Sequence, residues 1–495
     1  MVSPSLPLCQ VLVAENAPIR FGTDGWRGII GADFTFSRLV RAAKAAAWVL
    51  HRTYGSGTPR MIVGYDRRFL AEQFAAAVAE VLVASGYEVW LASHPAPTPA
   101  LSWAVKAETA LGALVITASH NPGMYSGLKV KGAFAGSVPP AVTQAIEAQL
   151  ASGDPPPVGL GCGSLHFFDP WPMYCEALQQ QVNCTPIRAA IEAGQLRVYA
   201  DVMHGVAAGG LARILGIAVP EFRSDRDVLF GGGAPEPIGR YLHQTQEQLR
   251  QMPHTGQTVC LVFDGDADRL AVIDGEGTLY TAQELMPILI DHLAQHSPYR
   301  GAVIKSISSS DLMSNVAALH GLPVIETPIG FKHIADRMVA GDAILLGGEE
   351  SGGIGYGHHI PERDALLSAL YLLEAIVTSG RSVGEYYHSL QHQVGFFSHY
   401  DRIDLRLETE HQRQQLEHLL ATNPLQRILD SAVVACNRSD GYKFYLETGA
   451  WLLVRFSGTE PLLRLYCQAP SPEDVQAILA WMQAWLHERF SPPTT

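Results

Sequence analysis

Residues 261–269 read Leu-Val-Phe-Asp-Gly-Asp-Ala-Asp-Arg, an apolar run that leads directly into three carboxylates at alternate positions. The run is typical of a buried strand, and side chains two residues apart on an extended chain point to the same side. Asp264, Asp266 and Asp268 would then gather about 5 Å apart, where two like charges repel by about 3 kcal/mol at an effective dielectric constant of about 20. Oxygen ligands without a nearby Cys or His cluster favour Mg²⁺ over zinc.

Two other interpretations of this stretch are weaker. A solvated acidic loop would need no metal, but it would hold three carboxylates together without a balancing charge. A calcium-binding EF-hand loop needs Gly at its sixth position and Glu at its twelfth, where this chain has Arg269 and Gly275. We therefore expect a Mg²⁺ site directly after the strand.

The chain around this stretch repeats one layout of strands and helices. A strand, a helix, a strand, a second helix and a third strand follow one another, and the last strand ends in an unusual loop. This order predicts parallel sheets covered by helices, with ligands outside the carboxyl ends of the strands. The ranges expected to be strands are 61–66, 87–92, 111–116, 197–201, 258–263, 302–307, 323–326 and 343–346.

The domain organisation follows from this layout. A Pro- and Gly-rich stretch at 152–163 has linker composition, and after about residue 395 the layout changes to strands with fewer helices. We expect an α/β protein with three similar α/β domains of mixed or parallel sheets and a C-terminal α+β domain. The expected domains are residues 1–153, 164–280, 281–395 and 396–495.

Composition limits the classes of function. The chain has 495 residues, 47% of them hydrophobic, and a formal net charge of −13. Such a charge argues against nucleic-acid binding, and it means that an anionic ligand must be attracted by a local group of Arg and Lys. The 7 cysteines form no CxxC motif, and no apolar run approaches the length of a membrane span. We expect a cytoplasmic protein without a membrane partner; no feature indicates an oligomeric state.

Four further segments carry candidate functional groups. Ser119 follows an expected strand within Thr-Ala-Ser-His-Asn-Pro, and a phosphorylated Ser119 would supply a further hard oxygen ligand to the metal. His120 is adjacent to it, and we expect two neighbouring side chains not to face each other as a nucleophile and its base. Without the acidic stretch, a plain polar turn would explain this segment equally well.

Glycine-rich loops surround the other candidates, and each also has a purely structural explanation as a turn with surface side chains. Arg27 lies among glycines at 22–28 and Lys129 follows ten residues after Ser119. Glu349 and Ser351 lie between glycines, where they would exchange hydrogen bonds with sugar hydroxyls. Residues 455–461 read Arg-Phe-Ser-Gly-Thr-Glu-Pro, a candidate anion-binding nest.

Taken together and in this order, these motifs resemble the α-D-phosphohexomutase superfamily, which contains phosphoglucomutases and phosphomannomutases. They are Gly-Thr-Asp-Gly-Trp-Arg-Gly, Thr-Ala-Ser-His-Asn-Pro, Asp-Gly-Asp-Ala-Asp-Arg, Gly-Glu-Glu-Ser-Gly and Arg-Phe-Ser-Gly-Thr-Glu-Pro. The resemblance covers nearly the whole chain and implies a heart-shaped arrangement of four domains. It also implies an isomerase that binds sugar phosphates.

The resemblance implies a role for each candidate. Ser119 would carry the phosphoryl group, and Mg²⁺, one per chain, would bind Ser119, Asp264, Asp266 and Asp268. The expected catalytic residues are Ser119, Lys129, His120, Arg27 and Arg269, with Lys129 as a general acid or base. The expected substrate-binding residues are Glu349, Ser351, Lys332, His359, Arg363, Arg455, Ser457, Gly458 and Thr459.

Three positions depart from the family pattern, and they bear on the choice of sugar. Ser126 stands where Asn is common, Gly353 where His is frequent, and Arg363 where Lys is often found. We expect interconversion of hexose 1-phosphate and hexose 6-phosphate, with glucose first and mannose second, through hexose 1,6-bisphosphate as intermediate and activator. The alternatives are a hexose 1,6-bisphosphate synthase, a phosphatase acting through phosphoserine and a catalytically silent sugar-phosphate-binding regulatory protein.

Overall fold

The computed structural model describes residues 17–22, 24–55, 59–155, 162–253, 257–407, 409–456 and 462–490. Its first sheet has the strand order β1-β5-β4-β2-β3-β6, with β2, β3, β4 and β6 parallel and β5 antiparallel to its neighbours. The strands are β1 (Trp26–Ile29), β2 (Arg60–Tyr65), β3 (Glu88–Ala92), β4 (Gly112–Ile116), β5 (Tyr125–Gly132) and β6 (Ser164–Phe168). The helices are α2 (Phe36–Tyr54), α3 (Ala71–Ala84), α4 (Thr98–Ala107) and α5 (Pro140–Ser152).

One strand differs from the expected division of the chain. Residues 164–168 were expected to open the second domain, but β6 pairs in parallel with β3 at the edge of the first sheet. Most of β6 is exposed, Leu165 and Phe167 included, and it directly follows the linker-like stretch that predicts a domain boundary. The first sheet therefore extends beyond the Pro- and Gly-rich stretch.

The second sheet is the one that carries the acidic stretch. Its order is β11-β10-β9-β7-β8, and the buried strand β9 pairs in parallel with β7 and antiparallel with β10. The strands are β7 (Leu196–Asp201), β8 (Glu221–Phe222), β9 (Gln257–Phe263), β10 (Leu270–Asp274) and β11 (Leu279–Tyr280). The helices are α6 (Trp171–Gln181), α7 (Cys184–Glu192), α8 (Gly210–Leu215) and α9 (His243–Gln251), with short 3₁₀ turns η1 (Phe230–Gly232) and η2 (Gly239–Tyr241).

The third sheet, of order β13-β12-β14-β15, repeats the arrangement on a smaller scale. Its first helix begins with a capping box of Thr281 and Glu284, which satisfies two backbone N–H groups at that end. The strands are β12 (Ala302–Ser306), β13 (Val324–Thr327), β14 (Ile344–Gly348) and β15 (Ile354–Tyr356). The helices are α10 (Ala282–His296), α11 (Leu312–Leu319), α12 (Phe331–Val339), α13 (Ala365–Ser379) and α14 (Val383–Val394).

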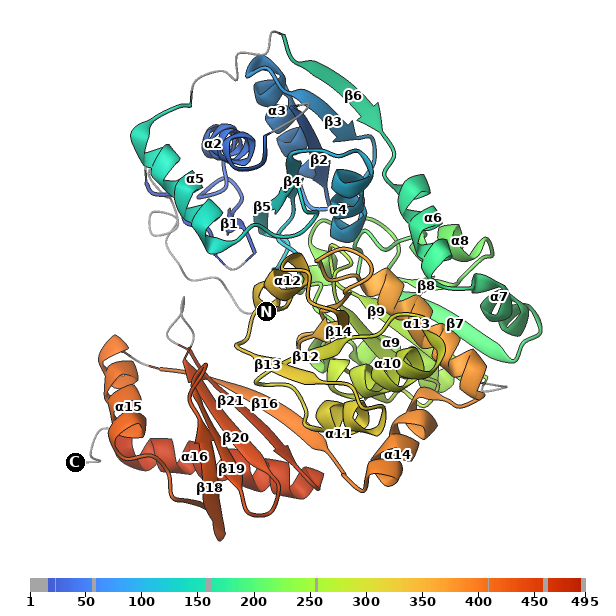
Figure 1. The fold of residues 1–495 in the computed structure, drawn as a ribbon, viewed down its shortest axis with the longest axis vertical. Coiled ribbons are helices and arrows are strands. Elements are labelled where there is room, and N and C mark those ends of the chain that lie inside the picture. The colour runs from blue at the N-terminus through green and yellow to red at the C-terminus, as the bar shows by residue number, and fades with distance from the viewer. Residues whose placement is uncertain are drawn as a thin grey trace.

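The fourth sheet is antiparallel throughout, in the order β16-β21-β20-β19-β18-β17. Its strands are β16 (His399–Arg406), β17 (Arg427–Ile428), β18 (Ser431–Asn437), β19 (Tyr442–Leu446), β20 (Trp451–Phe456) and β21 (Leu462–Ala469). Two helices, α15 (Glu410–Thr422) and α16 (Pro472–Phe490), accompany it. The expected fold class, three α/β units followed by a C-terminal α+β unit, is confirmed (Figure 1).

The hydrophobic cores show how the units are joined. One buried cluster covers the first sheet, a second runs without interruption through the second and third sheets, and a third belongs to the C-terminal unit alone. The C-terminal unit stands beside the other three in Figure 1, connected through α14 and β16. A smaller buried cluster joins Ile307 of the third unit to Trp451, Leu453 and Tyr466 of the C-terminal unit, so these two units also share an apolar contact.

The length and hydropathy of a helix decide whether it can span a membrane. In the described part of the chain, no single helix is long and apolar enough to cross a membrane. The pair α13 and α14 passes on length and composition, but it is bent by 75°. Most of α13 is buried in the core shared by the second and third units.

Candidate active site

Two loops that follow strand ends meet at Ser119. The loop after β4 holds Ser119, and the loop after β9 holds Asp264, Asp266 and Asp268, here called the acidic triplet. The Ser119 hydroxyl donates a hydrogen bond of 2.9 Å to Asp264 Oδ2, across 145 residues of sequence. The structure thus brings together the two segments on which the predicted site depends, at the carboxyl ends of two strands.

Ser119 has an unusual backbone conformation. Its φ is +50°, in the left-handed region that non-glycine residues seldom adopt, and its N–H donates to Thr117 Oγ1 at 2.9 Å. In this conformation its Oγ lies 3.2 Å from His120 Nδ1. The expectation that two neighbouring side chains would not face each other was therefore wrong, because the left-handed turn brings them to the same side.

Arg68, which sequence reasoning missed, holds the serine loop in place. Its guanidinium is fully buried and donates to the backbone carbonyl of Ser119 at 2.6 Å. It also donates to Asp66 Oδ2 at 3.1 Å, which balances its charge. The other acceptors are the carbonyls of Asn121 at 2.7 Å, Pro122 at 2.9 Å and Tyr125 at 3.0 Å. A single arginine thus closes the loop around the serine.

The acidic triplet fits a divalent cation. Ligand oxygens of its three residues lie within 4.8 Å of one another, and all three side chains are buried. Among the described residues, Asp266 Oδ1 and Asp268 Oδ1 are buried without a hydrogen-bond partner, as expected of oxygens that would bind a metal ion. Burial, and then the Asp268 and Asp266 carboxylates, raise the pKa of Asp264 well above its usual range. Oxygen donors of this kind suit Mg²⁺.

Lys129 and Arg363 partly neutralise the triplet. Lys129 Nζ lies 2.8 Å from Asp24 Oδ2, 2.8 Å from Asp266 Oδ2 and 2.9 Å from Asp268 Oδ2. Burial opposes its charge, but these three carboxylates outweigh it and raise the pKa of Lys129 well above its usual range. Arg363 Nη2 lies 2.7 Å from both Asp24 Oδ2 and Asp268 Oδ2. The structure thus places Arg363, expected at the sugar, against the acidic triplet.

Asp24 is a second residue that sequence reasoning missed. It comes from the turn before β1 and accepts from both Lys129 and Arg363, so it separates two cations that would otherwise repel each other. Burial would raise its pKa, but Lys129, Lys131 and Arg363 outweigh burial and hold the pKa of Asp24 well below the usual range. Asp24 lies within the glycine-rich motif at 22–28, in which the sequence indicated only Arg27 as a functional residue.

The remaining expected catalytic residues lie around this centre. Arg27 Nη1 donates to Asn121 Oδ1 at 2.5 Å, on the serine loop. Arg269 Nε lies 3.9 Å from Asp268 Oδ1. Burial, then the Arg269 and Arg27 guanidinium groups, lower the pKa of His120 well below its usual range, so its imidazole is neutral near pH 7. The site therefore combines several cations with one neutral imidazole beside the serine.

The loop at residues 347–353, here called the sugar loop, is anchored through its two carboxylates. Glu349 Oε1 accepts from the Gly330 backbone N–H at 2.7 Å, which ties it to the segment before Lys332. Burial, and then Glu350, raise the pKa of Glu349. Ser308 Oγ donates to Glu350 Oε2 at 2.6 Å. Lys332 and Ser351 are both partly exposed.

His359 is placed differently from the other expected sugar-binding residues. Its side chain is enclosed, with Nε2 3.0 Å from Asp364 Oδ2 and its ring stacked on Trp103 at a centroid distance of 5.1 Å. Asp364 in turn caps α13 through the Leu367 N–H. In this structure the His359 side chain is buried, and its part in sugar binding stays a prediction.

The candidate anion-binding segment at residues 455–461, here called the anion loop, is described only in part. Arg455 lies at the end of β20, and its Nε is 3.0 Å from both carboxylate oxygens of Asp440. The predicted residues Ser457, Gly458 and Thr459 lie outside the described residues. Their part in anion binding stays a prediction.

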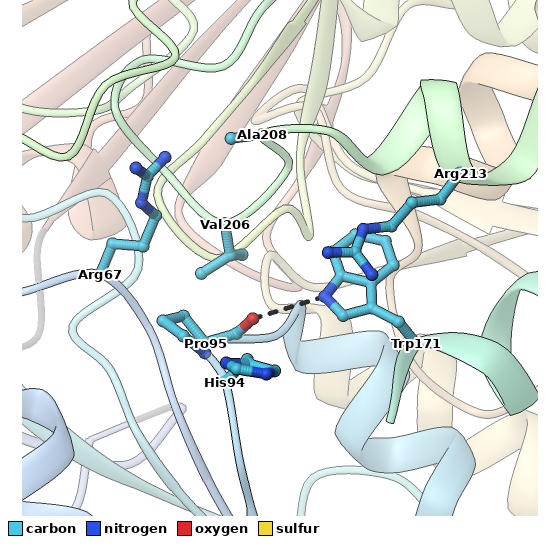
Figure 2. Close-up of a pocket in the computed structure, with 7 residues that line it drawn as sticks. All are labelled: Arg67, His94, Pro95, Trp171, Val206, Ala208 and Arg213. Atoms are coloured by element: carbon cyan, nitrogen blue, oxygen red, sulfur yellow. Dashed lines mark hydrogen bonds between the residues drawn. The ribbon is translucent and has the colours of Figure 1, made fainter. Parts of the chain in front are cut away.

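A cavity of about 250 Å³ lies between the first and second units, lined by Arg67, His94, Pro95, Trp171, Val206, Ala208 and Arg213 (Figure 2). Its guanidinium groups are already engaged. Arg67 Nη1 donates to the Gly205 and Ser224 carbonyls, at 3.1 and 2.9 Å. Arg213 lies over the Trp171 ring, 5.2 Å from its centroid. The cavity is therefore a packing feature of the two units rather than a second site.

Comparison with known proteins gives one consistent result. Models described as phosphoglucomutase/phosphomannomutase alpha/beta/alpha domains I, II and III match residues 18–156, 172–277 and 281–394, and the C-terminal domain model matches 406–482. A phosphoglucosamine mutase from Frankia alni is 30% identical over 465 residues, 91% of this chain and 94% of that protein. A phosphoglucomutase/phosphomannomutase from Thermococcus kodakarensis is 27% identical, over 93% of this chain and 96% of that protein. The solved structure of a candidate phosphomannomutase from Thermus thermophilus has a TM-score of 0.82 at 32% identity and covers 95% of this chain and 99% of that one.

Proposed function

The chain belongs to the phosphoglucomutase/phosphomannomutase family, and from this premise we propose that it interconverts hexose 1-phosphate and hexose 6-phosphate through a phosphoserine at Ser119. The observation that carries the proposal is the 2.9 Å contact between the Ser119 hydroxyl and Asp264. It supports a phosphoryl group on Ser119 that would lie against the acidic triplet. Residues on separate strands would hardly converge in this way for a merely structural turn.

The proposed reaction has two phosphoryl transfers. In the first, the bond between phosphorus and Ser119 Oγ breaks as a substrate hydroxyl forms a new P–O bond; the hydroxyl proton passes to Ser119 Oγ, which gives hexose 1,6-bisphosphate and a free serine. In the second, the bisphosphate has turned around, and Ser119 Oγ loses its proton and bonds to the other phosphorus as the bond from that phosphorus to the sugar oxygen breaks; the proton ends on the released sugar oxygen. The neutral His120, with Nδ1 3.2 Å from Oγ, is placed to accept that proton. The product leaves as the isomeric monophosphate.

The charges around Ser119 suit this chemistry. Phosphoryl transfer depends on positioning and on charge stabilisation more than on covalent chemistry by the protein. Arg27, Arg269 and Arg363 supply fixed positive charge, and Lys129, held between Asp24, Asp266 and Asp268, is the candidate general acid or base. Asp264, Asp266 and Asp268, with the phosphoserine, would hold one Mg²⁺, which when bound supplies charge neutralisation to the phosphate oxygens.

We infer that glucose is the preferred sugar, with mannose second. A glucosamine phosphate carries an ammonium group, which a charged carboxylate would recognise. Burial and Glu350 raise the pKa of Glu349, which disfavours its charged form, and the Gly-Glu-Glu-Ser-Gly motif at 348–352 favours glucose by resemblance. Several relatives are named phosphoglucosamine mutase, so glucosamine 1-phosphate is the substrate to compare with glucose 1-phosphate.

The carrier role is tested on a Ser119→Ala variant. We expect its turnover to fall by several orders of magnitude, while intact-protein mass spectrometry shows one phosphate on the wild-type protein and none on the variant after incubation with glucose 1,6-bisphosphate. The matched control is Ser102→Ala, because Ser102 is also a buried serine of the first unit and its hydroxyl has no hydrogen-bond partner among the described residues. Near-normal turnover of Ser119→Ala would overturn the proposal.

A kinetic panel tests the sugar preference and distinguishes a mutase from a bisphosphate synthase. Glucose, mannose and glucosamine 1-phosphates are compared with and without added bisphosphate, and the ranking by kcat/KM should place glucose first. Accumulation of bisphosphate in the presence of a separate phosphoryl donor, instead of monophosphate isomerisation, would indicate a hexose 1,6-bisphosphate synthase.

A further inference from the structure

Asp440 makes contacts in two parts of the molecule at once. It lies in the turn between β18 and β19 of the C-terminal unit, and its Oδ2 accepts a 2.8 Å hydrogen bond from the Ile329 backbone N–H of the third unit. Both of its oxygens also lie 3.0 Å from Arg455 Nε. One carboxylate thus joins the anion loop's arginine to a backbone segment 111 residues earlier in the chain.

That segment is the same one that holds the sugar loop. Ile329 and Gly330 are consecutive, and while the Ile329 N–H donates to Asp440, the Gly330 N–H donates to Glu349 at 2.7 Å. Gly330 has a φ of +128°, so the chain turns here in a conformation that a residue with a β-carbon would resist. Two adjacent amides therefore fix the carboxylates of Glu349 and Asp440 relative to each other.

Other contacts between the third and C-terminal units do not reach Arg455. Asn437 Nδ2 donates to Glu326 Oε1 at 3.0 Å, and the Asp311 N–H donates to Gln468 Oε1 at 2.8 Å. These bonds hold the units together without touching the anion loop. Asp440 differs from these residues because it contacts both the third unit and the Arg455 guanidinium.

We propose that Asp440 is a positioning residue that sets Arg455 at a fixed place relative to the sugar loop. The inference rests on the proposed function, in which Arg455 holds the phosphate of the substrate that does not react. Asp440 engages only the Nε–H of the guanidinium, so the four N–H donors on Nη1 and Nη2 are not taken up by it. Glu349 is held by the Gly330 N–H, and Arg455 is held through Asp440 by the Ile329 N–H. The groups that bind the sugar and its remote phosphate are therefore kept at a fixed separation in either orientation of the bisphosphate.

The test compares three single variants by steady-state kinetics and by competitive inhibition with inorganic phosphate. Asp440→Ala should raise KM for the hexose monophosphate and the inhibition constant of phosphate by about tenfold each, with kcat changed by less than about threefold. Asp440→Asn keeps an oxygen for the Ile329 N–H but cannot accept from Nε with both atoms, so it should raise KM without lowering the melting temperature. Gln468→Ala is the docking control, because Gln468 Oε1 accepts from the Asp311 N–H across the same interface, and it should leave KM and the phosphate constant unchanged.

A double variant separates this inference from the proposal on which it rests. If Asp440 acts through Arg455, the Asp440→Ala, Arg455→Ala double variant should have the KM of Arg455→Ala alone. An unchanged KM in Asp440→Ala, as in the Gln468→Ala control, together with a raised KM in Arg455→Ala, would overturn this inference only. An Arg455→Ala variant with unchanged KM would overturn the phosphate anchor and this inference together.

Discussion

Gly265 is packed against the backbone carbonyl oxygen of Ser119: a β-carbon on Gly265 would lie 2.5 Å from that oxygen. No heavy atoms of this kind approach so closely, and the oxygen belongs to the backbone of a loop that Arg68 holds from the other side. The glycine between the first two aspartates is therefore what lets the loop of the acidic triplet reach the serine.

A Gly265→Ala substitution should therefore separate the two loops. We expect turnover to fall about 100-fold, because a displacement of about 1 Å at a reacting group costs roughly that much. Circular dichroism should show an intact fold. The control is Gly239→Ala, since a β-carbon on Gly239 would meet only a Leu279 methyl group, at 3.8 Å. Equal activity of the two variants would show that the close approach is not needed.

Replacement of Arg68 should affect both stability and catalysis. Arg68→Ala would leave the buried Asp66 carboxylate unpaired and several carbonyls without a donor, so we expect a loss of about 3–5 kcal/mol in the free energy of unfolding. Arg68→Lys keeps the charge but has no planar fork, and it should retain most of the stability while kcat falls. Urea denaturation and steady-state kinetics measure the two effects. A fully active Arg68→Lys variant would contradict the proposed clamp.

The sequence was informative where chemistry repeats over short distances. The spacing of the acidic triplet and its position after an apolar run predicted a cation site, because both are local properties of a strand and its loop. Arg68, Asp24 and Asp440 were missed because each acts on a segment far away along the chain. Nothing local distinguishes Arg68 from a surface arginine, although it is fully buried. The burial of His359 against Trp103 and Asp364 was likewise not predictable from the local sequence.

The acidic triplet should destabilise the protein in the absence of metal. The pKa of Asp264 is raised in the folded state, so its contribution to stability is greatest below the unfolded pKa of about 4 and is lost as pH rises through the folded value. Asp264→Asn keeps an oxygen for the Asp268 and Arg269 N–H groups. At pH 8 with EDTA we expect this variant to melt a few degrees above the wild type. Mg²⁺ should raise the melting temperature and restore turnover only in the wild type, and a lower melting temperature of the metal-free variant would contradict the expected repulsion.

Gly353 makes room for Arg363. A β-carbon on Gly353 would lie 2.2 Å from Arg363 Cδ, so this departure from the family pattern and the arginine at 363 are linked by packing. We expect Gly353→Ala to move Arg363 away from Asp268 and to lower kcat by about 10- to 100-fold. The Gly353→Ala, Arg363→Met double variant should be no worse than Arg363→Met alone. Additive losses would show that the two residues act independently.

Lys443 should give the docking of the C-terminal unit a dependence on pH. Its buried Nζ donates to the Ile307 carbonyl of the third unit at 2.9 Å, and burial together with Lys305 lowers the pKa of Lys443 to about 8. A lysine with a lowered folded pKa destabilises the folded state below that value, and the penalty disappears as pH rises to the unfolded pKa. Between pH 8 and pH 10 the wild type should therefore gain stability relative to Lys443→Met, by up to about 3 kcal/mol. Thermal unfolding of both proteins across this range measures the difference, and parallel pH profiles would show that Lys443 is already neutral or already solvated.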